Sequence, residues 1–120
     1  MAEKRKYNLE ERLLNFASMV IDAVEGLPET KVCTHLGGQL LRSGTSPALN
    51  YGEAQAAESK KDFVHKLQVI LKELRETGIC LQLLHRKQAL QNDAIIGEGR
   101  ELIAIFTTSA KTANGNLDSP

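Results

Sequence analysis

Residues 39–77, QLLRSGTSPALNYGEAQAAESKKDFVHKLQVILKELRET, decide the fold of this chain. Within and beyond this stretch, apolar side chains and one threonine repeat at alternating intervals of four and three residues: Phe63, Leu67, Ile70, Leu74, Thr77, Leu81 and Leu84. This heptad spacing predicts a helix with one continuous apolar face. Val64, Leu71 and Gly78 add a second row beside the first. A helix with two such rows packs against more than one neighbour, which favours a helix bundle over a two-stranded coiled coil.

The segments before this helix predict two more helices. Asn8, with Glu11 three residues later, resembles a capping box and begins a periodic apolar segment that ends near Gly26. Thr30 can cap a second helix, which we expect to run over residues 30–57 as one bent helix. The kink is expected near Pro47, because proline removes a backbone donor and clashes with the preceding turn.

The remainder of the chain completes a bundle. A fourth helix is predicted to begin near Asn92, with apolar side chains such as Phe106 on its inner face. No segment shows the alternation that is typical of strands, and the short connections favour antiparallel neighbours. We therefore expect an all-α, antiparallel up-down four-helix bundle over residues 1–113, followed by a disordered polar tail over residues 114–120.

Composition restricts the class of function. The chain has 120 residues with 15 Lys plus Arg and 15 Asp plus Glu, so its formal net charge is zero. Proteins that bind many nucleic-acid phosphates are usually strongly basic, and this single chain lacks that property. The N-terminus lacks the apolar segment of a signal peptide, and no run approaches the roughly 20 apolar residues of a membrane span. With Cys33 and Cys80 as separate thiols, we expect a cytoplasmic protein with no membrane partner.

Polar side chains recur at helical spacing on the two central helices. On the second helix they are Arg42, Ser46, Asn50 and Glu53, and on the third they are Asp62, Lys66, Glu73 and Glu76. Residues at these spacings lie on one face of each helix. If the two faces meet, Arg42 and Lys66 gain carboxylate partners and Asn50 can bridge them. We interpret the stripes as a packing network that fixes register between helices or between subunits, with a ligand or partner site at the kink as the alternative.

The residues give little support for catalysis. Four-helix bundles that hold paired metals use two Glu-x-x-His motifs, and only Asp62 with His65 approximates one here. Cys33 stands near a helix start, where a thiol can be activated, yet the sequence shows no paired base. We therefore expect no catalytic residue, no metal and no cofactor. A carboxylate metal-binding bundle enzyme is the weakest alternative; it would use Glu53, Glu73, Glu76 and His65.

Short basic clusters are the candidate nucleic-acid contacts. Lys60 and Lys61 form one cluster, and Arg86 with Lys87 forms part of another. Each is short, and acids such as Glu58 stand close by, so solvated helix ends explain them as well. A symmetric assembly would repeat every cluster around its axis and could build a positive field that the single chain lacks.

The stretch QLLRSGTS-x-x-x-NY-x-EAQ-x-x-ES-x-x-DF-x-x-KL-x-x-x-LKE-x-RET closely resembles the four helix bundle protein family, whose members are related to proteins encoded in intervening sequences of 23S rRNA genes. The upstream segment LPETK-x-x-x-HL-x-x-QLLRSGTS fits as well. The resemblance implies a short antiparallel bundle that assembles into a homo-oligomer, typically a five-fold ring, without enzymatic activity. It places recurring interaction or assembly positions at Arg42, Asn50, Tyr51, Glu53, Asp62, Phe63, Lys66, Glu73 and Glu76.

Related accessory proteins of diversity-generating retroelements form similar rings that bind a reverse transcriptase and nucleic acid. This chain departs from the family pattern at Pro47, where valine is usual, and at Ile79-Cys80, where an aromatic pair is usual. We expect a non-enzymatic, homo-oligomeric scaffold or binding protein whose partner is RNA or an RNA-handling protein. The alternative is a pure assembly module whose polar stripes serve packing alone.

Overall fold

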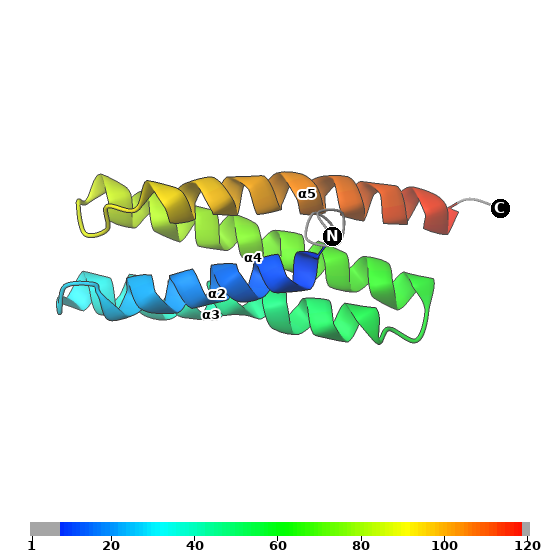
Figure 1. Ribbon diagram of the computed structural model, residues 1–120, viewed down its shortest axis with the longest axis horizontal. Helices are drawn as coiled ribbons and strands as arrows, with labels where there is room; N and C mark the ends of the chain where they lie inside the picture. The colour runs from blue at the N-terminus through cyan, green and yellow to red at the C-terminus, as the bar shows by residue number, and fades with distance from the viewer. Residues whose placement is uncertain (1–7, 119–120) are drawn as a thin grey trace.

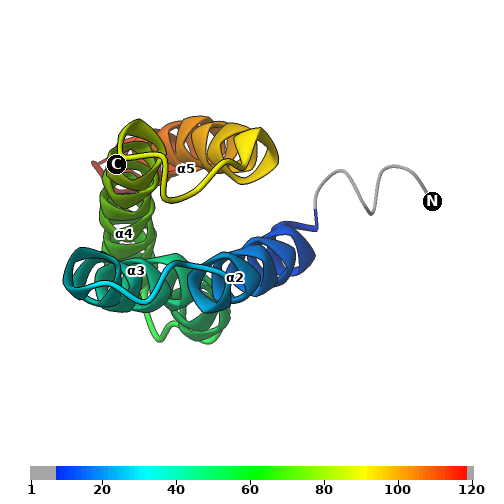
Figure 2. The ribbon, with the colours of Figure 1, turned by 90° about the vertical axis from the view of Figure 1, so that its left-hand side faces the viewer.

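The computed structural model describes residues 8–118, which form four helices joined by short loops (Figure 1). The helices are α2 (Leu9–Glu25), α3 (Lys31–Gln55), α4 (Lys60–Arg86) and α5 (Asp93–Asp118). Seen along the bundle, α3 lies beside α2, and α4 connects this pair to α5 (Figure 2). Neighbours in sequence pack closely, whereas α2 and α5 contact each other much less. The prediction of an all-α four-helix bundle is confirmed.

Each helix begins after a capping side chain that accepts a hydrogen bond from the backbone N–H three residues later. This contact satisfies one of the N–H groups that the first helical turn leaves unpaired. The four capping residues are Asn8, Thr30, Ser59 and Asn92. The helix starts are therefore set by local sequence, as the capping pattern predicts.

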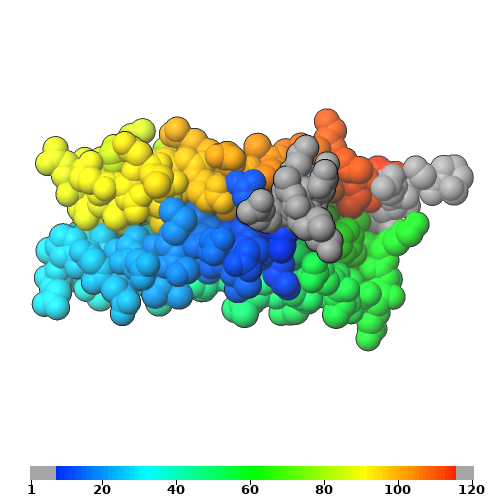
Figure 3. All heavy atoms as spheres, in the orientation of Figure 1, coloured from blue at the N-terminus to red at the C-terminus, as the bar shows by residue number. Residues whose placement is uncertain are grey.

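The core lies where the apolar rows of the helices meet. Every member of the heptad row on α4 is buried except Phe63, which is 37% exposed. On α2, Leu13, Phe16 and Val20 are buried, but Leu14 is 51% exposed. Leu14 stays exposed because α3 is the main neighbour of α2, whereas α5 contacts α2 little. Figure 3 shows the side of the molecule on which α2 and α5 lie. The atoms of α2 (blue) and of α5 (yellow to orange) are in contact there.

Two glycines of α3 allow α2 to approach closely. A Cβ atom on Gly44 would lie 2.7 Å from both methyl groups of Val20, and one on Gly37 would lie 3.2 Å from Leu27. A side chain at Gly44 would require Val20 of α2 to move, whereas one at Gly37 would require only a small shift of the Leu27 side chain, which lies just after α2. The intrinsic cost of glycine in a helix, about 1 kcal/mol relative to alanine, is therefore offset by packing at these two sites.

Pro47 lies inside a single helix. As expected, α3 continues across it from Lys31 to Gln55, and Pro47 is buried. The kink itself stays a prediction. At the other end of the chain, a disordered tail was expected over residues 114–120. The structure places residues 114–118 in α5, which ends at Asp118, and residues 119–120 lie outside the described part of the chain. Gly115 does not take the positive φ of a helix-ending glycine, and a single glycine penalty does not stop the helix.

Three of the helices are long enough to raise the question of a membrane span. The helices α3, α4 and α5 have 25, 27 and 26 residues. Within residues 8–118, however, polar side chains interrupt every helix, and none combines the length and apolar character that crossing a bilayer requires.

Candidate functional site

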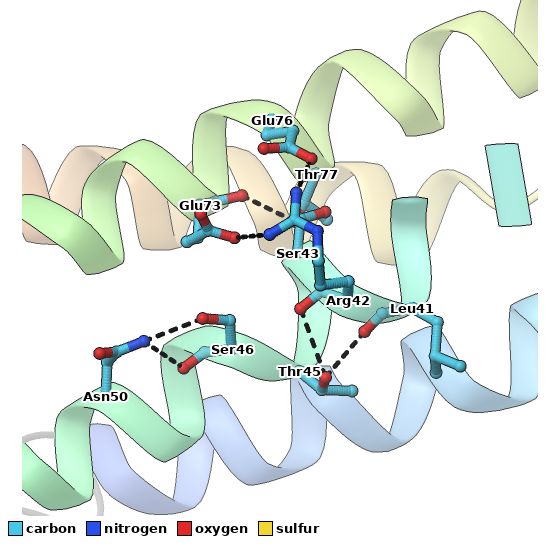
Figure 4. A network of polar contacts seen from close by, with 9 residues as sticks. All are labelled: Leu41, Arg42, Ser43, Thr45, Ser46, Asn50, Glu73, Glu76 and Thr77. Atoms are coloured by element: carbon cyan, nitrogen blue, oxygen red, sulfur yellow. Dashed lines mark hydrogen bonds and ion pairs between the residues drawn. The ribbon is translucent and has the colours of Figure 1, made fainter. Parts of the chain in front are cut away.

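The two predicted polar stripes face each other across α3 and α4. The Arg42 guanidinium on α3 forms ion pairs with Glu73, at 2.8 Å, and with Glu76 on α4 (Figure 4). Further along, Lys66 of α4 pairs with Glu53 of α3 at 2.7 Å. Both cations therefore have the carboxylate partners that the sequence spacing predicted. From Arg42 to Glu53 the residue number rises along α3, whereas from Glu73 to Lys66, their partners, it falls along α4. These two helices therefore run in opposite directions.

The ion pairs differ in their exposure to water. The Glu73 side chain is 12% exposed, whereas the Arg42 side chain is 55% exposed. Hydrogen bonds to Glu76 and Glu73, together with their charges, raise the pKa of Arg42. A hydrogen bond to Glu53 likewise raises the pKa of Lys66. The network thus consists of charged groups that satisfy one another, which a buried carboxylate such as Glu73 requires.

A neutral hydrogen-bonded pair lies beneath the Arg42 ion pairs. The Thr77 hydroxyl oxygen on α4 is 2.9 Å from the Ser43 hydroxyl oxygen on α3 and 2.8 Å from the Glu73 carbonyl oxygen. Both Ser43 and Thr77 are fully buried. Together with Arg42, they fix the lateral register of α3 and α4 (Figure 4).

Three predicted site residues have other surroundings. Asn50 does not bridge the helices; its side-chain amide donates to the carbonyl and hydroxyl oxygens of Ser46, one turn earlier in α3. Tyr51 is half-buried and packs edge-on against Phe106 of α5, with ring centroids 5.9 Å apart. Asp62 lies in the first turn of α4, where its charge adds weakly to the raised pKa of Lys66.

Large apolar side chains are exposed beside the ion pairs. Leu41 and Leu49 on α3 are 40% and 68% exposed, and Ile79 and Leu83 on α4 are 59% and 43% exposed. Helical spacing puts Gly38 and Gly52 on the same side of α3 as these leucines. We call this surface the α3–α4 face; it consists of Gly38, Leu41, Arg42, Leu49, Gly52, Ile79 and Leu83.

The two basic clusters are not brought together. Lys60 and Lys61 lie in the first turn of α4, whereas Arg86 and Lys87 lie at its other end. A helix of 27 residues is about 40 Å long at 1.5 Å per residue. The four side chains therefore form two separate surfaces and not one basic patch.

Sequence reasoning missed an ion pair between α2 and α5. Arg12 pairs with Glu98 at 2.7 Å and with Glu101 at 3.4 Å. A hydrogen bond to Glu98 is the main cause that raises the pKa of Arg12, while partial burial opposes it. The spacing of Glu98 and Glu101, three residues apart on one helix, was the available signal, but nothing in the sequence connects them with Arg12.

The residues considered for chemistry are dispersed or engaged in structural contacts. Glu53, Glu73 and Glu76 are all held in ion pairs. Among the side chains that the structure describes, residues 8–115, no group of three or more histidines, cysteines, aspartates or glutamates converges as metal ligands would. Cys33 and Cys80 are free and buried, and burial raises the pKa of the Cys80 thiol. Its protonated form is a poor nucleophile at neutral pH.

Comparison with known proteins gives a consistent family assignment. No curated protein matches the chain. A crystal structure of a protein of unknown function from the S23 ribosomal protein family of Bacteroides thetaiotaomicron VPI-5482 is similar, with 30% sequence identity and a TM-score of 0.79. The similarity covers 85% of this chain and 97% of that one. The family model described as 23S rRNA-intervening sequence protein matches residues 5–107, and the chain therefore belongs to this family.

Proposed function

We propose that the protein is a non-enzymatic homo-oligomer that acts as a scaffold or binding protein for RNA or an RNA-handling partner. The observation that carries this proposal is the α3–α4 face. It combines exposed leucine and isoleucine side chains with an ion-pair network whose charges are already neutralised within the chain. Such a surface suits contact with another protein surface better than it suits chemistry on a small substrate.

The glycines on this face support assembly with a second copy. A Cβ atom on Gly38 or Gly52 would meet nothing within 4 Å, so neither glycine is required by packing inside one chain. Each costs the helix about 1 kcal/mol relative to alanine. Close approach of another helix would offset this cost, as the α2–α3 contact does for Gly44.

The polar network would then define the register of the assembled subunits. Arg42 is more than half exposed, and a second copy on the α3–α4 face would shield its ion pairs from water. Polar groups in such a position favour one arrangement of helices over others. We propose a five-fold ring, following the resemblance to the four helix bundle protein family, and a cytoplasmic location.

Two observations support an RNA partner, the family description and the effect of symmetry on the basic clusters. The description of the family refers to 23S rRNA, and the chain carries basic clusters at both ends of α4. A ring presents each cluster once per subunit, so that the charge density at one end can far exceed that of the neutral single chain.

Sedimentation velocity tests the assembly. The variant Leu49→Glu places a charge on the α3–α4 face, which is expected to disrupt the contact between subunits and shift the oligomer to monomer. Each chain should still fold, because Leu49 is exposed within one chain. Leu14→Glu, at a similarly exposed position on α2, is the matched control and is expected to leave the oligomer intact. Arg42→Ala is expected to weaken the assembly. A wild-type monomer at micromolar concentration, or equal effects of both leucine variants, would contradict the proposal.

Gel shifts with ribosomal RNA and duplex DNA at two salt concentrations test the binding. Phosphate contacts predict RNA binding at low salt that weakens as salt increases. If neither nucleic acid binds at low salt, the RNA part of the proposal is wrong. An intact oligomer would then favour the second candidate, a pure assembly module, which is consistent with the zero net charge of the chain.

A further inference from the structure

A cavity of about 270 Å³ lies between the last turns of α4 and the first turns of α5. Its lining residues take no part in the ion pairs between α3 and α4. Of these residues, only Arg86 belongs to the basic clusters considered above for RNA binding. Three side chains of α4 and three of α5 line it: Gln82, His85, Arg86, Asp93, Ile96 and Arg100.

The cavity contains two arginines that have no carboxylate partner. Among residues 8–118, Arg12 and Arg42 form ion pairs, whereas Arg86 and Arg100 form none. Both are exposed and border the same space. Two guanidinium groups outnumber the single carboxylate of Asp93, so the lining has an excess of positive charge.

His85 adds a polar group that the bundle does not satisfy. Its side chain is half-buried, and its Nδ1 atom is buried without a hydrogen-bond partner in the described part of the chain. In native structures nearly all buried polar atoms have a hydrogen-bond partner, so a buried Nδ1 atom without one requires an explanation. The imidazole, the Gln82 amide and the arginines can all donate hydrogen bonds.

The position of the cavity further favours an anion. α5 begins at Asp93, and the first turn of a helix carries partial positive charge. Asp93 lines the same space and opposes an anion by like charge. This opposition is useful for a test, because removal of the carboxylate must then change affinity in the direction opposite to removal of an arginine.

We propose that this cavity binds a phosphate group, with Arg86 and Arg100 as its main ligands and His85 and Gln82 as additional donors. Planar guanidinium groups match phosphate oxygens in bidentate geometry. The phosphate can belong to a free compound or to an RNA backbone. In the second case the inference rests on the proposed RNA-binding function and specifies where one end of α4 contacts the nucleic acid.

Isothermal titration of the 120-residue protein with sodium pyrophosphate tests the site directly. We expect wild-type binding that weakens about ten-fold in Arg100→Gln, because a charge-assisted contact is lost. We expect Asp93→Asn to bind more tightly than wild type. Arg75→Gln is the matched control, since Arg75 is exposed on α4 and lines no part of the cavity. Circular dichroism checks that each variant retains wild-type helix content.

Two results would overturn the proposal. One is the absence of pyrophosphate binding at low salt by the wild type. The other is an equal loss of affinity in Arg100→Gln and Arg75→Gln, which would indicate general attraction by surface charge. Weaker pyrophosphate binding by Asp93→Asn than by the wild type would contradict the role assigned to the Asp93 carboxylate.

Fluorescence anisotropy with an RNA oligonucleotide distinguishes the two sources of phosphate. If RNA occupies the cavity, Arg100→Gln weakens RNA binding and lowers the slope of log affinity against log salt by about one, while Arg75→Gln does not. If only pyrophosphate binding changes, the site takes a free phosphate compound. Complete absence of RNA binding contradicts the proposed function, but it leaves the pyrophosphate result as an independent test of the cavity.

Discussion

The hydroxyl oxygens of Ser43 and Thr77 lie 2.9 Å apart at a fully buried point between α3 and α4. This contact joins the two most extensively packed helices of the bundle, directly beneath the ion pairs of Arg42. Water cannot reach either hydroxyl, so each depends on the other or on nearby backbone. The pair therefore holds the register of α3 against α4 from inside, while the ion pairs hold it from the surface.

Thr77→Val should destabilise the protein through this pair. The change keeps the shape of the side chain but removes both contacts of the threonine hydroxyl and leaves the Ser43 hydroxyl buried without its partner. A buried unpaired polar group costs about 1–3 kcal/mol, which urea denaturation can measure as a lower free energy of unfolding.

The double variant Ser43→Ala with Thr77→Val supplies the control for this prediction. With both hydroxyls removed, no polar group remains unpaired at the contact, and the double variant should lose less stability than the sum of the single variants. Additive losses would show that the two hydroxyls do not interact.

Gly44→Ala should destabilise the bundle by overpacking. The new methyl group would lie 2.7 Å from both methyl groups of Val20, which is fully buried and rigid at χ1. We expect a loss of about 1–3 kcal/mol by thermal or urea unfolding. Gly97→Ala is the control, because a Cβ atom there meets nothing within 4 Å. Its higher helix propensity should raise stability by up to about 1 kcal/mol. Equal effects of the two changes would contradict the close approach of α2 and α3.

Arg12→Met should loosen α2 from α5. The two helices contact each other little, so the ion pairs of Arg12 with Glu98 and Glu101 form a large share of what joins them. Because the pair with Glu98 is only partly exposed, we expect a loss of about 1 kcal/mol, which decreases at high salt. Hydrogen exchange should show faster opening of α2, while amides in the middle of α4 keep their protection. Unchanged exchange in α2 would contradict this role.

The polar stripes show what sequence spacing can predict at this site. Arg42 and Lys66 were expected to find carboxylates on the opposite helix, and both do, because helical periodicity fixes the face of each residue. Asn50 was expected to bridge the helices and does not. Its amide reaches the Ser46 carbonyl one turn earlier in its own helix, and such a local partner competes with any partner across the interface.

The sequence did not predict which segments far apart in the chain contact each other. The Arg12–Glu98 pair joins residues 86 positions apart, and the cavity between α4 and α5 brings together Arg86 and Arg100 from different helices. Periodicity assigns a residue to a face, but only the packing angle between helices decides which faces meet.

The sequence predicted that the fourth helix ends before residue 114, whereas α5 continues through residues 114–118. Glycine and asparagine favour a helix end without enforcing one.

The buried thiol of Cys80 gives a pH-dependent contribution to stability. Burial, with a smaller effect of the nearby Glu76 charge, raises the pKa of this thiol above its value in the unfolded chain. Its contribution is therefore complete below the unfolded pKa of about 8.5 and is lost as pH rises from there through the folded pKa. Cys80→Ala lacks this contribution. The difference in the free energy of unfolding between wild type and Cys80→Ala should consequently narrow between pH 8 and pH 10, measured by urea denaturation under reducing conditions. A difference that stays constant over this range would mean that the thiol ionises equally easily in the folded and unfolded protein, contrary to its burial between the helices.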